Sequence, residues 1–269
     1  MFDYHIHSEF SMDSQEKLER IAQAAIQKNL REICITDHVE FDLQSPTKGN
    51  HDLVIDPMAY KEAIEKLQEQ YAFDLVIKAG MEVGMQPHII QRCNEYVEKG
   101  DFDFIIGSLH SVDKLIIHDG DFIAKWGRGQ EAYAKYFEEY YQCVAGGALF
   151  NVLGHYDLMK RHLKGTDRDQ VFRDNFDVIE ATLKLVIEKG RGIEVNTSGF
   201  YYQIGSAMPS IDFLKLYKSL GGEILTLGSD GHKADNIGHC FEETLHAIQQ
   251  AGFQYLTTFD KMQPKFHRI

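Results

Sequence analysis

Residues 1–8, MFDYHIHS, form a short apolar segment that ends in two histidines separated by one residue. Residues two positions apart in a β-strand point to the same face, so His5 and His7 are expected to lie side by side. Two imidazoles in this arrangement can bind one metal ion. An H-x-H pair alone is a weak signal, and it gains weight here because similar pairings of a strand with a histidine or an acid recur along the chain.

Six more apolar segments follow, each short and mostly bounded by Gly, Asp, Asn or His. Short runs that are apolar on both faces are typical of buried parallel strands. Together with the first segment, strands are therefore expected at residues 2–5, 32–36, 75–80, 102–107, 149–153, 192–195 and 223–227.

Amphipathic stretches separate these strands. Ser14 is a candidate N-cap of the first helix, and Pro57 occupies the first position of the second. The expected helices cover residues 14–28, 56–70, 88–98, 131–145, 169–188, 210–219 and 241–251.

The alternation of strands and helices predicts an α/β fold with right-handed crossovers between parallel strands. Seven repeats fit either a closed β/α barrel or an open doubly wound sheet, and the strand count alone does not choose between them. No linker or change in composition interrupts the chain, so residues 1–269 are expected to form a single domain. The two longest excursions, residues 39–55 and 111–130, each follow a strand and are expected as loops at the face that carries the site.

Nearly every expected strand ends with a histidine or an acid, and in a barrel these ends meet at one mouth. Burying so many polar groups together costs several kcal/mol unless cations compensate. Imidazole and carboxylate ligands without cysteine favour zinc, manganese or iron, and their number favours two or three ions. The candidate metal ligands are His5, His7, Asp13, His38, Glu82, His110, His155, Asp230 and His232. Among the seven remaining histidines, only His118 is expected to approach the mouth.

The bulk composition narrows the range of partners. A net charge of −13 argues against a nucleic-acid partner, which usually requires a basic face. The sequence contains no run of about 18 apolar residues, so no membrane-spanning helix is expected. The four cysteines are far apart and form no C-x-x-C pair, and the N-terminus does not resemble a signal peptide. A cytoplasmic protein, either a monomer or a small homo-oligomer, is expected.

The ordered motifs resemble the polymerase and histidinol phosphatase (PHP) family. They are H-x-H at the first strand, T-D-H at the second, a Glu after the third, G-S-x-H at the fourth, G-H at the fifth and G-S-D-x-H at the seventh. The resemblance spans residues 5–232. It implies a distorted seven-stranded (β/α)7 barrel with a trinuclear metal centre. The segments GSLHSVD and GHYDLMKR look most like the histidinol-phosphate phosphatases within the family.

The resemblance also implies how the ligands are shared among three ions. One ion would take His5, His7, Glu82 and Asp230; a second would share Glu82 and add His110 and His155; the third would take His38, His232 and Asp13. Many family members have a histidine where this chain has Asp13.

Other residues are candidates for catalysis and substrate binding. Arg161 is six residues beyond His155, and its guanidinium can clamp a phosphate through paired hydrogen bonds. Lys160 and Arg128 are weaker candidates for the same role. Asp37 would orient one of the ligand histidines. His232 is also a candidate for substrate binding, and the pair Tyr201-Tyr202 would line the substrate pocket.

The predicted activity is hydrolysis of a phosphomonoester by a metal-bridged hydroxide, with Glu82, Asp230, Arg161 and Asp37 in the catalytic set. By resemblance the substrate is L-histidinol phosphate, an intermediate of histidine biosynthesis. One alternative is a PHP-type enzyme that acts on another small phosphate ester or on a nucleotide phosphodiester. Another is a non-enzymatic module, like the degenerate family domains attached to bacterial DNA polymerases.

Overall fold

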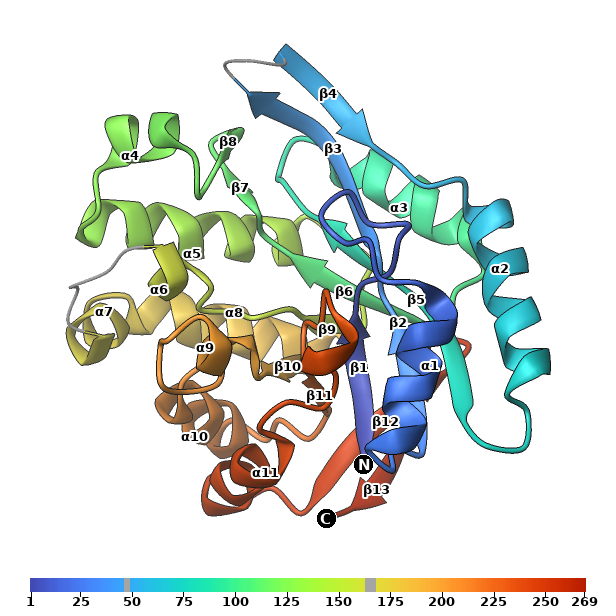
Figure 1. Ribbon diagram of the computed structural model, residues 1–269. Helices are drawn as coiled ribbons and strands as arrows, with labels where there is room; N and C mark the ends of the chain where they lie inside the picture. The colour runs from blue at the N-terminus through green and yellow to red at the C-terminus, as the bar shows by residue number, and fades with distance from the viewer. Residues whose placement is uncertain (46–48, 163–167) are drawn as a thin grey trace.

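The computed structural model describes residues 1–45, 49–162 and 168–269, and it contains all seven expected parallel strands. They pair in parallel in the order β1-β2-β5-β6-β9-β10-β11. The fold is therefore a mixed α/β fold built on a mostly parallel sheet (Figure 1). The seven strands are β1 Phe2–Ile6, β2 Glu32–Ile35, β5 Val76–Gly84, β6 Phe104–Ser108, β9 Val152–Leu153, β10 Gly192–Asn196 and β11 Leu225–Gly228.

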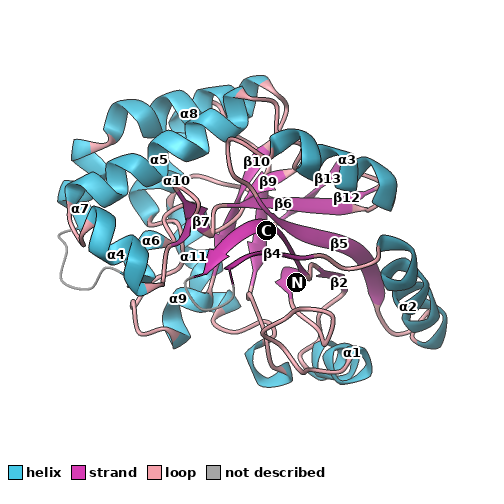
Figure 2. Ribbon diagram, turned by 90° about the horizontal axis from the view of Figure 1, so that it is seen from above, coloured by secondary structure: helices cyan, strands magenta, loops and turns pink. Residues whose placement is uncertain are grey.

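Helices lie around the outside of the strands (Figure 2). None of the helices in the described ranges is both long enough and apolar enough to cross a bilayer. The helices are α1 Leu18–Gln27, α2 Pro57–Gln70, α3 Ile90–Gly100, α4 Gly120–Trp126, α5 Gln130–Ala145, α6 Met159–His162, α7 Arg168–Asp174, α8 Phe176–Glu188, α9 Ser198–Tyr201, α10 Ile211–Ser219 and α11 Phe241–Gln250, with a 3-10 turn η1 at Ala234–Asn236.

Three short helices, α4, α6 and α9, were not expected, and α4 lies in an excursion that was expected to be a loop. Two of the expected helices also differ in detail. Ser14 does not cap α1, which begins four residues later. Its hydroxyl instead donates to the carbonyls of His7 and His232 and joins the loop after β1 to the loop after β11. The single helix expected over residues 169–188 is two helices that meet at Asn175. The side-chain amide of Asn175 bonds the carbonyl of Val171, and such local bonds compete with helix continuation.

The excursion after His38 is a pair of strands and not a loop. Strand β3 (His38–Ser45) pairs antiparallel with β4 (Gly49–Leu53), and together they project from one end of the molecule in Figure 1. The excursion over residues 111–130 is not a loop either: strands β7 (Ser111–Val112) and β8 (Leu115–Ile116) follow β6, and β8 pairs with β3. These four strands form a side sheet. Its strand β3 alternates buried Val39, Phe41 and Leu43 with polar residues, the period of two expected for a strand.

The last parallel strand leads back to the first. Ile6 and Gly231 form a parallel bridge, in which the amide of His7 donates to the carbonyl of Gly231 at 3.0 Å. The amide of Gly231 donates in turn to the carbonyl of His5 at 3.3 Å. His5 and His7 therefore lie beside His232, although more than 220 residues separate them in the sequence.

The C-terminal hairpin was not predicted. Strands β12 (Tyr255–Asp260) and β13 (Gln263–Arg268) lie at the end of the molecule opposite the projecting β3–β4 pair (Figure 1). Phe259 of this hairpin packs against Phe104, with ring centroids 4.9 Å apart. The amide of Phe259 donates to the hydroxyl of Tyr4 at 2.8 Å. The hairpin thus covers a small apolar cluster at this end of the parallel strands.

We expect Phe259→Ala to lower the free energy of unfolding by about 3–5 kcal/mol, because the buried ring leaves a cavity against Tyr4 and Phe104. Urea denaturation followed by circular dichroism measures the change. Phe266→Ala is the matched control, since this side chain belongs to the same hairpin but is 48% exposed. Equal losses in the two variants would contradict the assigned packing.

Candidate metal centre

The carboxylate of Glu82, on β5, lies at the centre of the histidine cluster and is completely buried. Its Oε2 atom is 3.2 Å from Nε2 of His5, 3.4 Å from Nε2 of His7 and 3.0 Å from Nδ1 of His38. These histidines come from β1, from the residue that follows it and from the start of β3. Three imidazoles therefore converge on one carboxylate oxygen.

The other oxygen of Glu82 faces a second pair of histidines. Its Oε1 atom is 2.9 Å from Nε2 of His155 and 3.3 Å from Nε2 of His110, and these two nitrogens are 3.4 Å apart. The hydroxyl of Ser108 donates to the same oxygen at 2.6 Å. Glu82 thus lies between two groups of imidazoles and presents one carboxylate oxygen to each.

Asp230 follows β11 with a left-handed backbone, φ 54°. Such backbone strain persists only where the surroundings impose it, and it is frequent at functional sites. Its Oδ1 atom lies 3.3 Å from Nε2 of His7 and 3.8 Å from Nε2 of His5. Its Oδ2 atom accepts hydrogen bonds from Arg161 at 3.0 Å and from Ser198 at 3.1 Å.

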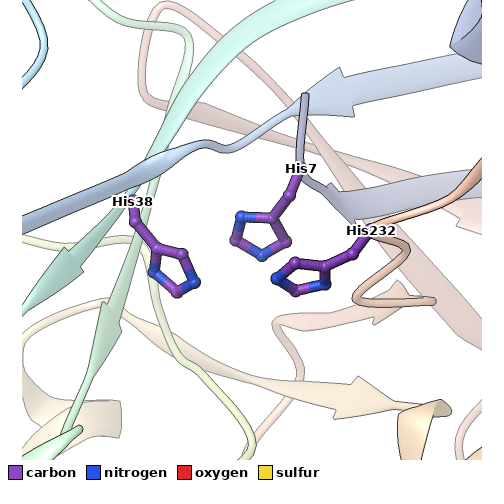
Figure 3. A group of neighbouring side chains, drawn as sticks. All are labelled: His7, His38 and His232. Carbon is purple, nitrogen blue, oxygen red and sulfur yellow. The ribbon is translucent and has the colours of Figure 1, made fainter. Parts of the chain in front are cut away.

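A third group of histidines lies toward the opening of the site. Figure 3 shows His7 between His38 and His232. The ring centroids of His38 and His232 are 4.3 and 4.1 Å from that of His7. Asp13 is half exposed, and its Oδ2 atom lies 3.1 Å from Nε2 of His232 and 3.6 Å from Nε2 of His38. The structure thus brings together all nine residues predicted as ligands, Asp13 included.

Two buried carboxylates that the sequence analysis did not single out hold histidines of the cluster from behind. Nδ1 of His5 donates to Glu194 and Nδ1 of His110 donates to Glu40, each at 2.5 Å. Each bond leaves the Nε2 atom facing Glu82, which fixes the tautomer suited to metal binding. Gly84 makes room for Glu40, because a Cβ at residue 84 would lie 1.8 Å from its Oε2 atom.

Asp37 acts one step further from the cluster than predicted. Its carboxylate accepts hydrogen bonds from the backbone and hydroxyl of Ser8 and from the hydroxyl of Ser11. Because the Ser11 hydroxyl donates to Asp37, it accepts from Nδ1 of His7 at 3.0 Å and from the amide of His38. Asp37 therefore orients His7 through Ser11.

The charges in the cluster balance one another. Burial disfavours the charged forms of Glu82 and His5, but their mutual attraction prevails. The pKa of Glu82 is held well below its usual value by His5, His38 and His110, and the pKa of His5 is raised well above its usual value by Glu194, Glu82 and Asp230. In contrast, burial and the neighbouring imidazoles of His232 and His38 lower the pKa of His7 well below its usual value. Glu82 is thus anionic and His7 neutral, the states required of ligands, whereas His5 carries a proton that a bound cation would displace.

The cluster contains ligand atoms that no described residue satisfies. Oε2 of Glu82 lies 3.0–3.4 Å from Nε2 of His5, Nε2 of His7 and Nδ1 of His38, but the geometry of these contacts forms no hydrogen bond. The four buried atoms have no other hydrogen-bond partner in the described part of the chain. Buried polar atoms are rarely left in this way. Their donor atoms, nitrogen and carboxylate oxygen, are those that zinc and similar cations take. Divalent cations therefore fit this site.

Among the described residues, the cluster contains five sets of three side chains whose donor atoms lie within 4.8 Å of one another, close enough to hold one metal ion. The group of Glu82, His110 and His155 coincides with the second predicted ion site. The other groups are His5, His7 and Glu82; His5, His155 and Asp230; His7, His38 and His232; and His38, Glu40 and His110.

A pocket of about 680 Å³ opens over the cluster, and Arg161 lines it. The guanidinium of Arg161 stacks 4.0 Å from the ring centroid of Tyr202, which also lines the pocket. The hydroxyl of Tyr201, the other predicted pocket residue, donates to the backbone carbonyls of Ser229 and Asp230. Tyr201 thus supports the strand end that carries Asp230, and Tyr202 is the better candidate for contact with a substrate.

Comparison with known proteins agrees with this geometry. Residues 3–198 match the PHP domain family. A histidinol-phosphatase of Lactococcus lactis subsp. lactis is 30% identical over 261 residues, which cover 97% of this chain and 95% of the relative. A relative from Clostridium acetobutylicum, named "Probable histidinol-phosphatase", is 31% identical over 94% of this chain and 95% of its own. The chain belongs to the PHP domain family.

A solved structure is similar over the whole chain. It is the histidinol phosphate phosphatase of L. lactis in complex with zinc, L-histidinol and phosphate. The TM-score is 0.87 at 29% sequence identity, with 98% of each chain covered.

We expect Glu40→Gln to weaken zinc binding by about ten- to hundred-fold, because an amide is a poorer partner than a carboxylate for Nδ1 of His110. Competition with a chromophoric chelator measures the affinity. Asp42→Asn is the control: Asp42 is on the same strand but pairs with His88, outside the cluster. Unchanged zinc affinity in a folded Glu40→Gln protein would refute this role.

Proposed function

We propose that this protein is a metal-dependent phosphomonoesterase that hydrolyses L-histidinol phosphate to L-histidinol and phosphate. The convergence of buried, unsatisfied imidazole and carboxylate atoms on Glu82, directly beneath a pocket that contains Arg161, carries the proposal. The names of the relatives, and the zinc, histidinol and phosphate bound to the L. lactis protein, support the choice of substrate.

We propose that the nine predicted residues hold two or three divalent ions, of zinc, iron or manganese. His5, His7, Glu82 and Asp230 would hold one; Glu82, His110 and His155 a second; and His38, His232 and Asp13 the third. When bound, such ions supply Lewis acidity that lowers the pKa of water and offsets charge on a phosphoryl group. The bonds from Glu194 and Glu40 hold the ligands in place beforehand, which reduces the rearrangement needed for binding.

Arg161 is the phosphate-binding residue of this proposal. One of its amino groups is held by Ser198 and Asp230, and its plane is fixed against the ring of Tyr202. A guanidinium held on two sides is already oriented for a phosphate, so little side-chain entropy is lost on binding. Its charge then stabilises the equatorial oxygens as negative charge spreads over them during transfer.

We also propose that the parallel strands close into a distorted seven-stranded barrel within one domain. The backbone bonds between Gly231 and residues 5 and 7 support closure between β11 and β1. A cytoplasmic location and a monomeric or small homo-oligomeric state stay predictions.

The purified protein, loaded with zinc, should release phosphate from L-histidinol phosphate with a higher kcat/KM than from a nucleoside monophosphate or a phosphodiester. Removal of metal by a chelator should abolish release, and added zinc should restore it. Phosphate release measured on the three esters side by side tests this. A preference for the diester, or activity that survives complete metal removal, would contradict the proposal.

Arg161→Ala should lower kcat/KM for histidinol phosphate by about 100- to 1000-fold, the range seen when one donor to a developing oxyanion is removed. Bound metal, measured by elemental analysis, should be retained. Arg173→Ala, at an exposed position on α7 outside the pocket, should keep full activity. A loss of metal equal to the loss of activity would instead mean that Arg161 serves to hold Asp230.

A further inference from the structure

We propose that Asp119 is a specificity-determining residue, whose carboxylate binds the N–H of the substrate's imidazole ring while the ring rests on the side sheet. This inference depends on the proposed function, because histidinol phosphate provides the imidazole. The imidazole ring would occupy the part of the pocket that the metal cluster and Arg161 do not line.

The side sheet, formed by β4, β3, β8 and β7, makes one wall of the pocket. Pairing of Gln44 with Leu115 joins β3 to β8, so the two excursions present one continuous surface. Three aliphatic side chains, Leu43, Leu53 and Ile116, line the pocket from this surface, together with His51 of β4. The floor of the pocket is made of imidazoles and carboxylates. A flat and largely apolar ring suits the wall, and a phosphate suits the floor.

Five acids line the pocket, and four of them are already engaged with the cluster. Glu82 and Asp230 lie among the histidines, Asp13 contacts His38 and His232, and Glu40 accepts from His110. The fifth is Asp119. The only ion-pair contact recorded for it in the described ranges is with His118 at 3.8 Å, longer than a hydrogen bond. Among the lining acids, Asp119 is therefore the one available to a substrate.

The position of Asp119 is fixed while its side chain stays available. Ile117 donates from its amide to the carbonyl of His110 at 3.0 Å, so the segment leading to Asp119 lies against a residue of the cluster. Asp119 precedes α4 as its N-cap residue, and aspartate there usually accepts from the helix backbone. Its side chain makes no such capping bond. The carboxylate, 34% exposed, instead lines the pocket.

The chemistry of the substrate matches this division of the pocket. Histidinol phosphate has a phosphate at one end and an imidazole at the other. With the phosphate at the cluster and Arg161, the ring can extend toward the aliphatic wall, where its N–H needs an acceptor. A site that provides such an acceptor rejects analogues that lack the donor, since a buried polar group would then be left unpaired. Asp119 would thus select for the imidazole.

The test is Asp119→Asn in the zinc-loaded protein. Calorimetric titration with L-histidinol should show binding weakened by about ten-fold, as expected for loss of a hydrogen bond to a charged group, with binding of inorganic phosphate unchanged. The kcat/KM for histidinol phosphate should fall by a similar factor. The kcat/KM for O-phosphoethanolamine, which has the amine and the phosphate but no ring, should stay the same. Asp121→Asn, an exposed acid two residues further along α4, should match the unmutated protein in every measurement.

The outcomes separate this inference from the proposed function. Equal losses on both esters, or weaker phosphate binding, would mean that Asp119 acts through the cluster and would overturn the inference. So would unchanged histidinol binding in Asp119→Asn. If the unmutated protein itself hydrolysed phosphoethanolamine but not histidinol phosphate, the proposed function would fail, and the inference with it.

Discussion

The structure depends on the burial of one carboxylate, that of Glu82, among imidazoles contributed by four separate segments of the chain. An anion in this position would be costly on its own, because desolvation penalises the charged form. Positive charge must therefore be supplied around it, either by protons on the histidines or by bound cations. Because the imidazoles around Glu82 come from separate segments, the ends of several strands must lie close together for Glu82 to be buried as an anion.

The cluster is held by a surrounding set of hydrogen bonds as well as by its own charges. Glu194 and Glu40 fix His5 and His110, and Ser11 with Asp37 fixes His7. Each of these partners is buried. Buried bonds of this kind restrict the rotation of the imidazole rings, so that the nitrogens face the centre before any ligand arrives.

The sequence predicted the seven parallel strands and the nine residues that gather at their ends, because hydrophobic runs and residue types are local signals. It missed the role of Glu40 and Glu194, which only long-range packing reveals. A signal for each existed: Glu194 is the one charged residue in the strand expected over residues 192–195, and Glu40 lies two residues after His38 on the same face. The C-terminal hairpin was missed as well, because Phe259 is buried by the rings of Tyr4 and Phe104, which are far from it in the sequence.

The bridge between Ile6 and Gly231 has a consequence for the order in which the protein matures. His5 and His7 are translated more than 220 residues before their neighbours Asp230 and His232. During translation, His5 and His7 therefore lack some of their partners until the later segment has been made. Such non-local contacts also form slowly. The nascent chain therefore acquires its full ligand set only after residues 230–232 have been made.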